Sequence, residues 1–291
     1  MKNVIIIGGT DGIGRAFAEH LINSQQVLIV GRNEQKGKAF RTKYGANASF
    51  IAADVSLLKN VVRLVEQIRA KFERIDAIIH TADILTTKRT ETAEGLEMSI
   101  AINYFSRVLF NYLMLNEAPG FRPEKIIHIA AAGFPPGNKF LEKFPPSPAD
   151  SAFRSHGYGQ MANDFYGLYM RDVFEQMGTQ INILNPGMVD TNIRRKGQFP
   201  KIFRLLEPLM NLLLSPIIKT PEEYIQIPLA ILNDESLAAR QSVLINAKGK
   251  AIRGNKVLNN PEVQRYVYER TIQTLEELTG MKLANDKLLV N

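Results

Sequence analysis

The stretch "NVIIIGGTDGIGRAFA", residues 3–18, joins a β-branched apolar run to the start of a helical pattern. Such a run favours a strand that is buried on both faces of a parallel sheet. Gly8, Gly12 and Gly14 follow, and glycine is required where a chain turns tightly and lays its backbone against a pyrophosphate. The helix that begins there directs its amide groups and positive dipole end at the phosphates. The stretch, with Ile13 inside it, therefore predicts a dinucleotide site after the first strand.

Six more short apolar runs follow along the chain, separated by longer helical patterns. These runs occupy residues 27–32, 49–55, 76–82, 125–131, 181–187 and 242–247. The pattern at 57–72, for example, repeats apolar residues at helical spacing. Such alternation predicts an α/β fold of the Rossmann type, with a doubly wound, seven-stranded parallel sheet. Because the composition does not change along the chain, residues 1–291 are predicted to form a single domain.

The composition excludes several classes of protein. The chain has 291 residues, of which 45% are hydrophobic and 22% charged, with no cysteine and four scattered histidines. We therefore expect no disulfide and no metal site. The net charge is +7, but no basic run marks a nucleic-acid arm. The opening "MKNVIIIGG" leads directly into a strand pattern, so we predict a cytoplasmic protein without a signal peptide or a transmembrane segment.

Two segments interrupt the alternation, and each follows the carboxyl end of a predicted strand. Residues 133–155 hold five prolines and are predicted to form a loop. Residues 191–220 begin basic and turn apolar, which suits a mobile lid over a lipophilic substrate or a peripheral membrane contact. Prolines 208 and 216 argue against a membrane span there, and a helix packed on the domain core is the alternative.

The motifs along nearly the whole chain resemble those of the short-chain dehydrogenase/reductase family. Besides the glycine pattern, "AADVS", "GLEMSIAINYFSRVLFNYLML" and "NPGMVDT" match family segments. The resemblance implies contacts to a nicotinamide dinucleotide from Asp54, Val55, Pro186, Gly187 and Thr191, and places Asn103 at the catalytic asparagine. The tail from residue 215 to residue 280 is most similar to the retinol-dehydrogenase-like branch. The family's central helices usually form a dimer, so the resemblance also implies a homodimer or a related oligomer.

The end of the second predicted strand bears on the choice of cofactor. A carboxylate there would bind the ribose 2′-hydroxyl, but the sequence has Arg32. A guanidinium favours the 2′-phosphate of NADP instead. The alternative interpretation of Arg32 is an ordinary exposed residue at the end of a strand.

The catalytic tetrad that the resemblance implies, Asn, Ser, Tyr and Lys, is degenerate in this chain. Ala131 stands at the serine position. Counting back from Pro186 by the family's spacing places His156 at the tyrosine position and Gln160 at the lysine position. Aligning Tyr158 with the catalytic tyrosine instead requires a two-residue deletion in the next helix, which would rotate its polar face inward.

Both candidate proton donors have alternative interpretations. An imidazole titrates near neutral pH, so His156 can donate a proton without a lysine, and Gln160 can bind ribose through neutral hydrogen bonds. Alternatively, both residues only fill the space of lost catalytic groups. Tyr158 reaches the site if the glycines beside it delay the start of the helix, and otherwise packs beneath the proline-rich loop.

Residues 80–83, "HTAD", also depart from the family's Asn-Asn-Ala-Gly. Asp83 adds a negative charge near the expected path of the cofactor, which weighs against tight binding. We predict an NADP-dependent oxidoreductase, a ketone or aldehyde reductase or an alcohol dehydrogenase, with a non-standard proton donor and a small, apolar substrate. The alternatives are a catalytically inactive NADP-binding homologue with an interaction or regulatory role, and a non-redox enzyme of the same fold.

Overall fold

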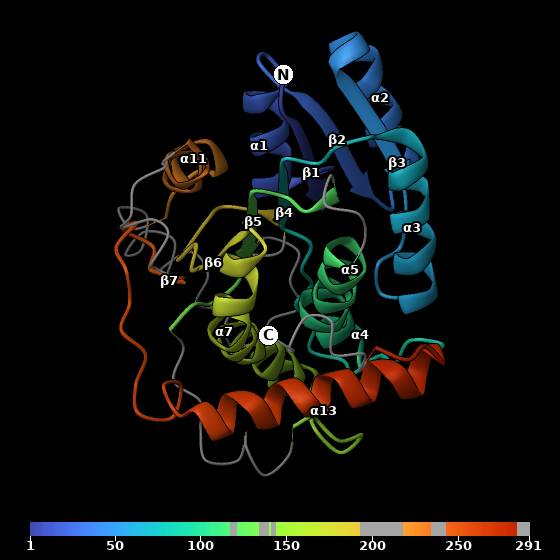
Figure 1. The fold of residues 1–291 in the computed structure, drawn as a ribbon. Coiled ribbons are helices and arrows are strands. Elements are labelled where there is room, and N and C mark those ends of the chain that lie inside the picture. The colour runs from blue at the N-terminus through green and yellow to red at the C-terminus, as the bar shows by residue number, and fades with distance from the viewer. Residues whose placement is uncertain (117–120, 134–139, 141–143, 193–217, 234–242, 284–291) are drawn as a thin grey trace, which may run out of the picture.

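The computed structural model describes the chain except for residues 117–120, 134–139, 141–143, 193–217, 234–242 and 284–291. Its centre is a parallel sheet with the strand order β3-β2-β1-β4-β5-β6-β7, which confirms the predicted seven-stranded Rossmann-type sheet (Figure 1). The strands are β1 (Asn3–Ile7), β2 (Gln26–Gly31), β3 (Ala48–Ala52), β4 (Ala77–His80), β5 (Lys125–Ile129), β6 (Gln180–Leu184) and β7 (Leu244–Ile245). The order reverses between β1 and β4, and open α/β sheets generally bind their ligands at the carboxyl edge beside such a reversal.

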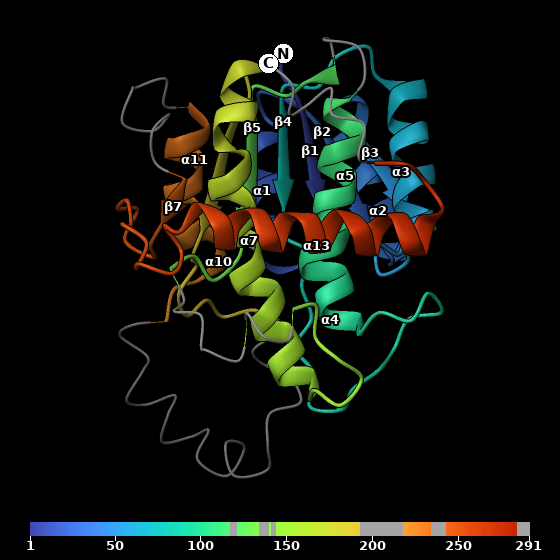
Figure 2. The same cartoon turned by 60° about the horizontal axis from the view of Figure 1, so that its bottom comes forward.

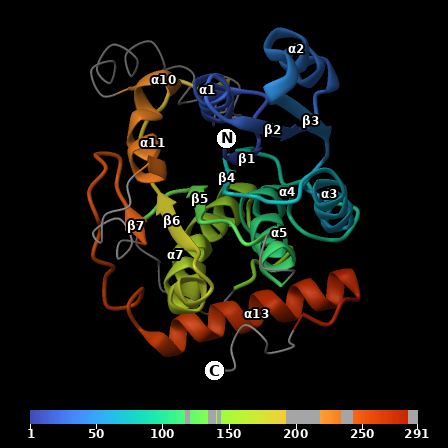
Figure 3. The ribbon, with the colours of Figure 1, turned by 45° about the horizontal axis from the view of Figure 1, so that its top comes forward.

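Helices cover both faces of the sheet (Figure 3). One layer contains α1 (Gly12–Leu21), α2 (Glu34–Tyr44), α10 (Pro221–Tyr224) and α11 (Gln226–Asn233). The other contains α3 (Leu58–Lys71), α5 (Ser106–Leu115) and α7 (Ala152–Gln176). Successive strand residues serve opposite layers: Ile5 belongs to the core under α3, α5 and α7, whereas Ile6 belongs to the core under α1 and α2.

The predicted central helix consists of three pieces. A short α4 (Met98–Ile100) leads into η2 (Ala101–Phe105), which is a π-helix, and then into α5. Asn103 lies in the middle of the π-helical segment and is fully buried. Single π-turns within α-helices occur frequently at functional sites, because the wider turn changes the direction of its side chains.

The predicted loop at 133–155 is too long at its C-terminal end. α7 begins at Ala152, because the hydroxyl of Ser151 caps it by accepting a hydrogen bond from the backbone N–H of Arg154 at 3.3 Å. The helix therefore continues through Gly157 and Gly159 without a late start. Of the predicted lid at 191–220, residues 193–217 lie outside the described part of the chain.

The helix α13 (Pro261–Thr279) runs across the outer side of α7 and α5 (Figure 2). Thr271 is fully buried and shares a hydrogen bond of 2.7 Å with the hydroxyl of Tyr104 in η2. The rings of Tyr169 in α7 and Tyr268 in α13 stack with centroids 4.8 Å apart. α13 thus occupies part of the face through which the family resemblance implies a dimer, and the oligomeric state stays a prediction.

A chain of hydrogen bonds crosses the core beneath β4 and β5. Nε2 of His80 lies 2.9 Å from Oδ1 of Asn111, and Nδ2 of Asn111 lies 2.9 Å from Nε2 of His128. Nδ1 of His128 lies 2.8 Å from Oδ1 of Asn163, whose amide nitrogen donates to the carbonyls of Asn103 and Gly159. Since both amide hydrogens of Asn163 are used, each later donor and acceptor is determined, and Nε2 of His128 must accept, so that imidazole is neutral.

The two buried histidines in this hydrogen-bond chain make the stability of the fold sensitive to acid. Burial, aided by the charge of Arg107, lowers the pKa of His80 from 6.5 to about 3, and burial also lowers the pKa of His128 well below 6.5. Below pH 6.5 the unfolded chain binds protons that the folded protein does not, so stability falls as the pH falls toward about 3. The loss is about 1.4 kcal/mol per pH unit for each histidine.

We predict that His80→Asn, which keeps an amide donor for Asn111, removes one histidine's share of this acid sensitivity. Urea unfolding at pH 7 and pH 5 measures the change. The variant is expected to lose about 1.4 kcal/mol less per pH unit than the wild type. An unchanged difference between the two pH values would show that His80 is not held neutral.

Candidate active site

The predicted phosphate loop packs tightly against the loop after β4. Gly8 has a φ of +94°, and a Cβ on it would lie 2.5 Å from the backbone nitrogen of Ala82. A Cβ on Gly14 would overlap the carbonyl oxygen of Gly8 and Oγ1 of Thr81. Thr81 donates through its backbone N–H at 2.8 Å and its hydroxyl at 3.0 Å to the carbonyl of Ile7, so this residue ties β1 to β4 despite the departures from the family motif.

The first turn of α1 faces the segment after β6 at close range. Gly12 has a φ of +50°, and a Cβ on it would lie 3.3 Å from Cγ2 of Thr191. Ile13 packs against the core on the α1 side. Asp11 caps α1 by accepting a hydrogen bond of 2.8 Å from the N–H of Gly12, and its carboxylate also accepts bonds from Asn192 and Lys36. The bare backbone fits a diphosphate, and the Asp11 carboxylate near it is balanced by Lys36.

The other predicted cofactor residues lie along the same carboxyl edge. Arg32 follows β2, is 58% exposed, and has its guanidinium 3.9 Å from the carboxylate of Asp54. Val55 is buried next to Asp54. Pro186 and Gly187 follow β6, and Gly187 has a φ of +67°. These residues share the sheet edge at which the resemblance expects the dinucleotide.

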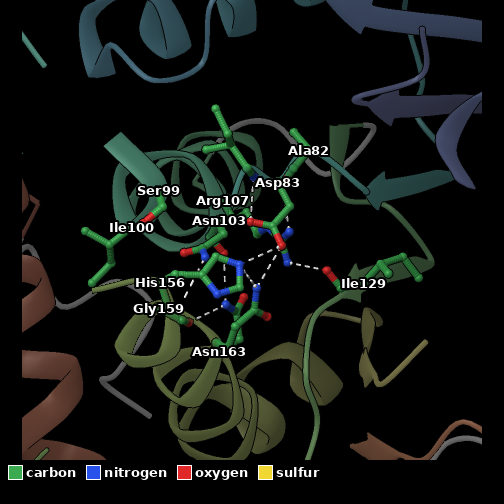
Figure 4. Close-up of polar contacts among 12 residues, drawn as sticks. Ala82, Asp83, Ser99, Ile100, Asn103, Arg107, Ile129, His156, Gly159 and Asn163 are labelled. Carbon is green, nitrogen blue, oxygen red and sulfur yellow. Dashed lines mark hydrogen bonds and ion pairs between the residues drawn. The ribbon is translucent and has the colours of Figure 1, made fainter. Parts of the chain in front are cut away.

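A cluster of polar side chains gathers between the loop after β4 and α7 (Figure 4). Oδ2 of Asp83 lies 3.2 Å from Nε2 of His156 and accepts a hydrogen bond of 2.9 Å from Nε2 of Gln160. His156 and Gln160 are one helical turn apart and therefore share a face of α7. The side chains of His156 and Asp83 are 18% and 19% exposed, so the cluster is only partly shielded from solvent.

Asn103, which belongs to η2, lies next to His156 (Figure 4). Its amide nitrogen donates to the backbone carbonyl of His156 at 3.4 Å, and its Oδ1 is buried without a hydrogen-bond partner. Oδ1 rests against Gly159, where a Cβ would overlap it. Glycine at position 159 thus allows α7 to approach η2 closely enough to join Asn103 and His156 in one site.

Charge determines how these groups titrate. Burial lowers the pKa of His156, but the charge of Asp83, the hydrogen bond to it and the charge of Glu97 outweigh burial and raise that pKa above 6.5. Burial raises the pKa of Asp83, but His156 and then Arg107 outweigh it, so the pKa of Asp83 is lowered. Each group therefore favours the charged form of the other, an imidazolium beside a carboxylate.

Comparisons with known proteins place this site in a family. A sequence model described as short chain dehydrogenase matches residues 2–134. An uncharacterized oxidoreductase of Saccharomyces cerevisiae is 27% identical over 294 residues, which cover 97% of this chain and 89% of that protein. Retinol dehydrogenase 14 of Mus musculus is 24% identical over 238 residues, covering 76% of this chain and 70% of that protein.

In its sequence the chain is similar to the short-chain dehydrogenase family. Its fold matches a short-chain dehydrogenase from Sphingobium yanoikuyae, solved in complex with NADPH, with a TM-score of 0.59 at 16% identity, covering 79% of this chain and 84% of that one. Short-chain dehydrogenases are oxidoreductases that use a nicotinamide cofactor. Within the described residues, no helix is both long and apolar enough to cross a membrane.

The two candidate proton donors lie in different surroundings. His156 contacts the polar cluster, whereas the side chain of Tyr158 is 4% exposed and its ring meets the edge of Phe140 with centroids 5.3 Å apart. Ala131, at the family's serine position, is partly buried after β5. The amide nitrogen of Gln160, which we expected to bind ribose, contacts Asp83 and His156.

Sequence reasoning missed two members of this site. Asp83 was recognised as a departure from the family's glycine, but not as a partner of His156. The buried Arg107 was missed entirely, although it donates hydrogen bonds of 2.9 Å to the carbonyls of Ala82 and Ile129. The available signal was that Arg107 stands one helical turn after Asn103 and is the only charged residue between Glu97 and Glu117.

We predict that Gly159→Ala destabilises the protein by about 1–3 kcal/mol, because the added Cβ must displace Asn103 or α7. Gly157→Ala in the same helix is the matched control, since its Cβ would have its nearest neighbour, Cε of Met161, 3.9 Å away. The control is expected to gain about 0.5–1 kcal/mol from reduced backbone entropy. Urea unfolding measures both, and equal effects of the two substitutions would contradict the close approach at Asn103.

Proposed function

We propose that the chain is an NADP-dependent carbonyl reductase or alcohol dehydrogenase in which His156 transfers the proton. The contact of 3.2 Å between His156 and Asp83 carries this proposal. In this proposal His156 takes the role that the family gives to tyrosine, and the contact with Asp83 supports a protonated imidazole beside Asn103. Tyr158 is directed into the core instead, where it packs on Phe140.

The chain's residues provide the steps that accompany hydride transfer. The loop from Gly8 to Gly14 and the amide end of α1 bind the diphosphate. The nicotinamide, when bound, supplies a hydride to a carbonyl carbon or takes one from an alcohol. His156 donates its proton to the carbonyl oxygen as the hydride arrives, so that the carbonyl becomes an alcohol and the imidazolium becomes neutral. In the oxidative direction the neutral imidazole accepts the hydroxyl proton.

Arg32 supports NADP as the cofactor. Its guanidinium is 58% exposed at the end of β2, and its ion pair with Asp54 is a long contact of 3.9 Å. A weakly held guanidinium is available to a 2′-phosphate, which it can bind through two parallel hydrogen bonds. The related structure from Sphingobium yanoikuyae contains NADPH.

The substrate is proposed to be a lipophilic alcohol or carbonyl compound. One relative is named for retinol, which is a largely apolar alcohol. The proposed lid, residues 191–220, includes the apolar run "FRLLEPLMNLLL" at 203–214. We place the enzyme in the cytoplasm as a single domain, with peripheral membrane contact through this run as one way to reach such a substrate.

A second candidate function is a cofactor-binding protein without turnover. It is favoured by the side chains at the lysine and serine positions. Gln160 has its amide engaged with Asp83 and His156, and Ala131 offers no hydroxyl to a carbonyl oxygen. The two candidates agree on NADPH binding and differ in whether any carbonyl compound consumes the cofactor.

We predict that the protein binds NADPH more tightly than NADH, and that Arg32→Gln weakens NADPH binding by about tenfold while leaving NADH binding unchanged. Only NADPH carries the 2′-phosphate that Arg32 would contact. Titration of each nucleotide by its own fluorescence measures both affinities. Arg41→Gln, farther along α2, removes the same charge and is expected to leave both affinities unchanged. Equal weakening by the two variants would refute a specific role of Arg32.

We predict that His156→Ala lowers turnover of a lipophilic ketone by about 10²–10⁴-fold, the range expected for loss of a general acid. Tyr158→Phe is the matched comparison and is expected to keep turnover close to that of the wild type. Consumption of NADPH followed by absorbance measures both. If Tyr158→Phe abolishes turnover and His156→Ala does not, Tyr158 is the donor. If NADPH binds but no ketone or aldehyde consumes it, the second candidate function applies.

A further inference from the structure

The two ring nitrogens of His156 have different surroundings. Nε2 lies 3.2 Å from Oδ2 of Asp83. Nδ1 makes no hydrogen bond to any residue that the structure describes, and it is not among the enclosed polar atoms of those residues. Nε2 is therefore anchored to the protein, while Nδ1 has no partner among the described residues and is not enclosed by them.

We propose that Asp83 holds a proton on Nε2 of His156 and thereby makes Nδ1 the nitrogen that exchanges a proton with the substrate. Asp83 is thus a positioning residue, which acts on the reaction through His156. The inference rests on the proposed function for its catalytic meaning, whereas the tautomer itself is a property of the free protein.

The geometry around Oδ2 of Asp83 supports a proton on Nε2. Nε2 of Gln160 lies 2.9 Å from Oδ2, and it also lies 3.2 Å from Nε2 of His156. Oδ2 of Asp83 and the two nitrogens therefore form a triangle in which each atom is within hydrogen-bond distance of the other two. If both nitrogens carry hydrogens directed at the carboxylate, the short distance between them follows from their shared acceptor and is not a separate hydrogen bond.

Arg107 keeps Asp83 in place and ionised. Its side chain is 1% exposed and donates hydrogen bonds of 2.9 Å to the carbonyls of Ala82, directly before Asp83, and Ile129, at the end of β5 (Figure 4). Its positive charge favours the ionised form of Asp83 even after His156 has lost a proton. Asp83 therefore remains an acceptor for the Nε2 proton throughout the reaction.

The charged groups that face His156 come from three elements. They are Asp83 after β4, Glu97 at the N-cap of α4, and Arg107 in α5. Asp83 and Glu97 favour the imidazolium, and Arg107 opposes it. Of these three charged groups, Asp83 is the one that contacts the ring, so it is the charge that can select which nitrogen keeps its proton when the ring becomes neutral.

The proton balance follows from this arrangement. In reduction, the Nδ1–H bond breaks, an O–H bond forms on the former carbonyl oxygen, and the ring becomes neutral with its remaining proton on Nε2. In oxidation, Nδ1 takes the hydroxyl proton while the hydride leaves for the nicotinamide. The proton between Nε2 and Asp83 stays in place in both directions.

The test is a pH titration of the full chain with ¹⁵N-labelled histidine, followed by NMR. The chain has four histidines, and His156→Ala identifies the signals of His156. Protonated and unprotonated imidazole nitrogens have well separated shifts, so the spectrum reports both the tautomer and the pKa. In the wild type we expect His156 to titrate above its ordinary pKa of 6.5 and to keep the Nε2 proton at high pH.

Two substitutions separate contact from charge. Asp83→Asn keeps the shape but removes the charge, and it is expected to lower the pKa of His156 and to mix the two tautomers. Glu97→Gln removes a nearby charge without contacting the ring, so it is expected to lower this pKa as well but to preserve the Nε2 tautomer. A wild-type Nδ1–H tautomer, or an Asp83→Asn variant with an unchanged tautomer and pKa, would overturn the proposal.

The kinetic arm uses ketone reduction by the wild type and by Asp83→Asn. The rate is expected to fall as the pH rises through the pKa of His156, and the variant should show this fall at lower pH. An absence of any NADPH consumption contradicts the proposed function and leaves the NMR result to decide the role of Asp83. Identical pH profiles in the two proteins, together with normal turnover, contradict the role of Asp83 alone.

Discussion

The carboxylate of Asp83 lies at the edge of the sheet with only 19% of its side chain exposed, so it needs charged partners. A carboxylate withdrawn from water is destabilising by several kcal/mol unless cations and hydrogen bonds compensate. His156 supplies one positive charge and Arg107 another, and Gln160 adds a hydrogen bond. Arg107 is itself buried, and burial lowers its pKa to about 10 while Asp83 favours its charged form. Each group therefore depends on the others to remain where it is.

This balance of charges connects four elements of the fold. Asp83 follows β4, Arg107 belongs to α5, His156 belongs to α7, and the carbonyl of Ile129 that Arg107 binds ends β5. The elements come together only because the helices pack closely, and Gly159 allows α7 to approach η2. Close helix packing and charge compensation thus meet in the cluster that contains His156. A change at either of them is expected to alter the titration of His156 as well as the stability of the fold.

The residues on the proposed cofactor side follow the family motifs more closely than the residues around His156 do. On the cofactor side, the loop from Gly8 to Gly14 keeps the bare backbone that a diphosphate requires, and Thr81 ties β1 to β4. On the other side, the chain has Asp83 and His156 where the family resemblance leads us to expect a glycine and a tyrosine. The proposed oxidoreductase would thus keep the family's way of binding a dinucleotide while providing the proton from a different pair of residues.

The sequence by itself determined the sheet, its seven strands and the position of the phosphate loop, because these depend on local patterns. A β-branched run that ends in glycine before a helix predicts a buried strand followed by a tight turn, without reference to distant residues. It did not determine where the loop after β5 ends, because the Ser151 cap outweighs the helix-weakening glycines. Only the tertiary structure decided that His156 meets Asp83, which lies 73 residues away, and that Tyr158 packs on Phe140. The physical reason is that pairing between distant side chains depends on helix packing and on charge compensation, and neither leaves a periodic pattern in the sequence.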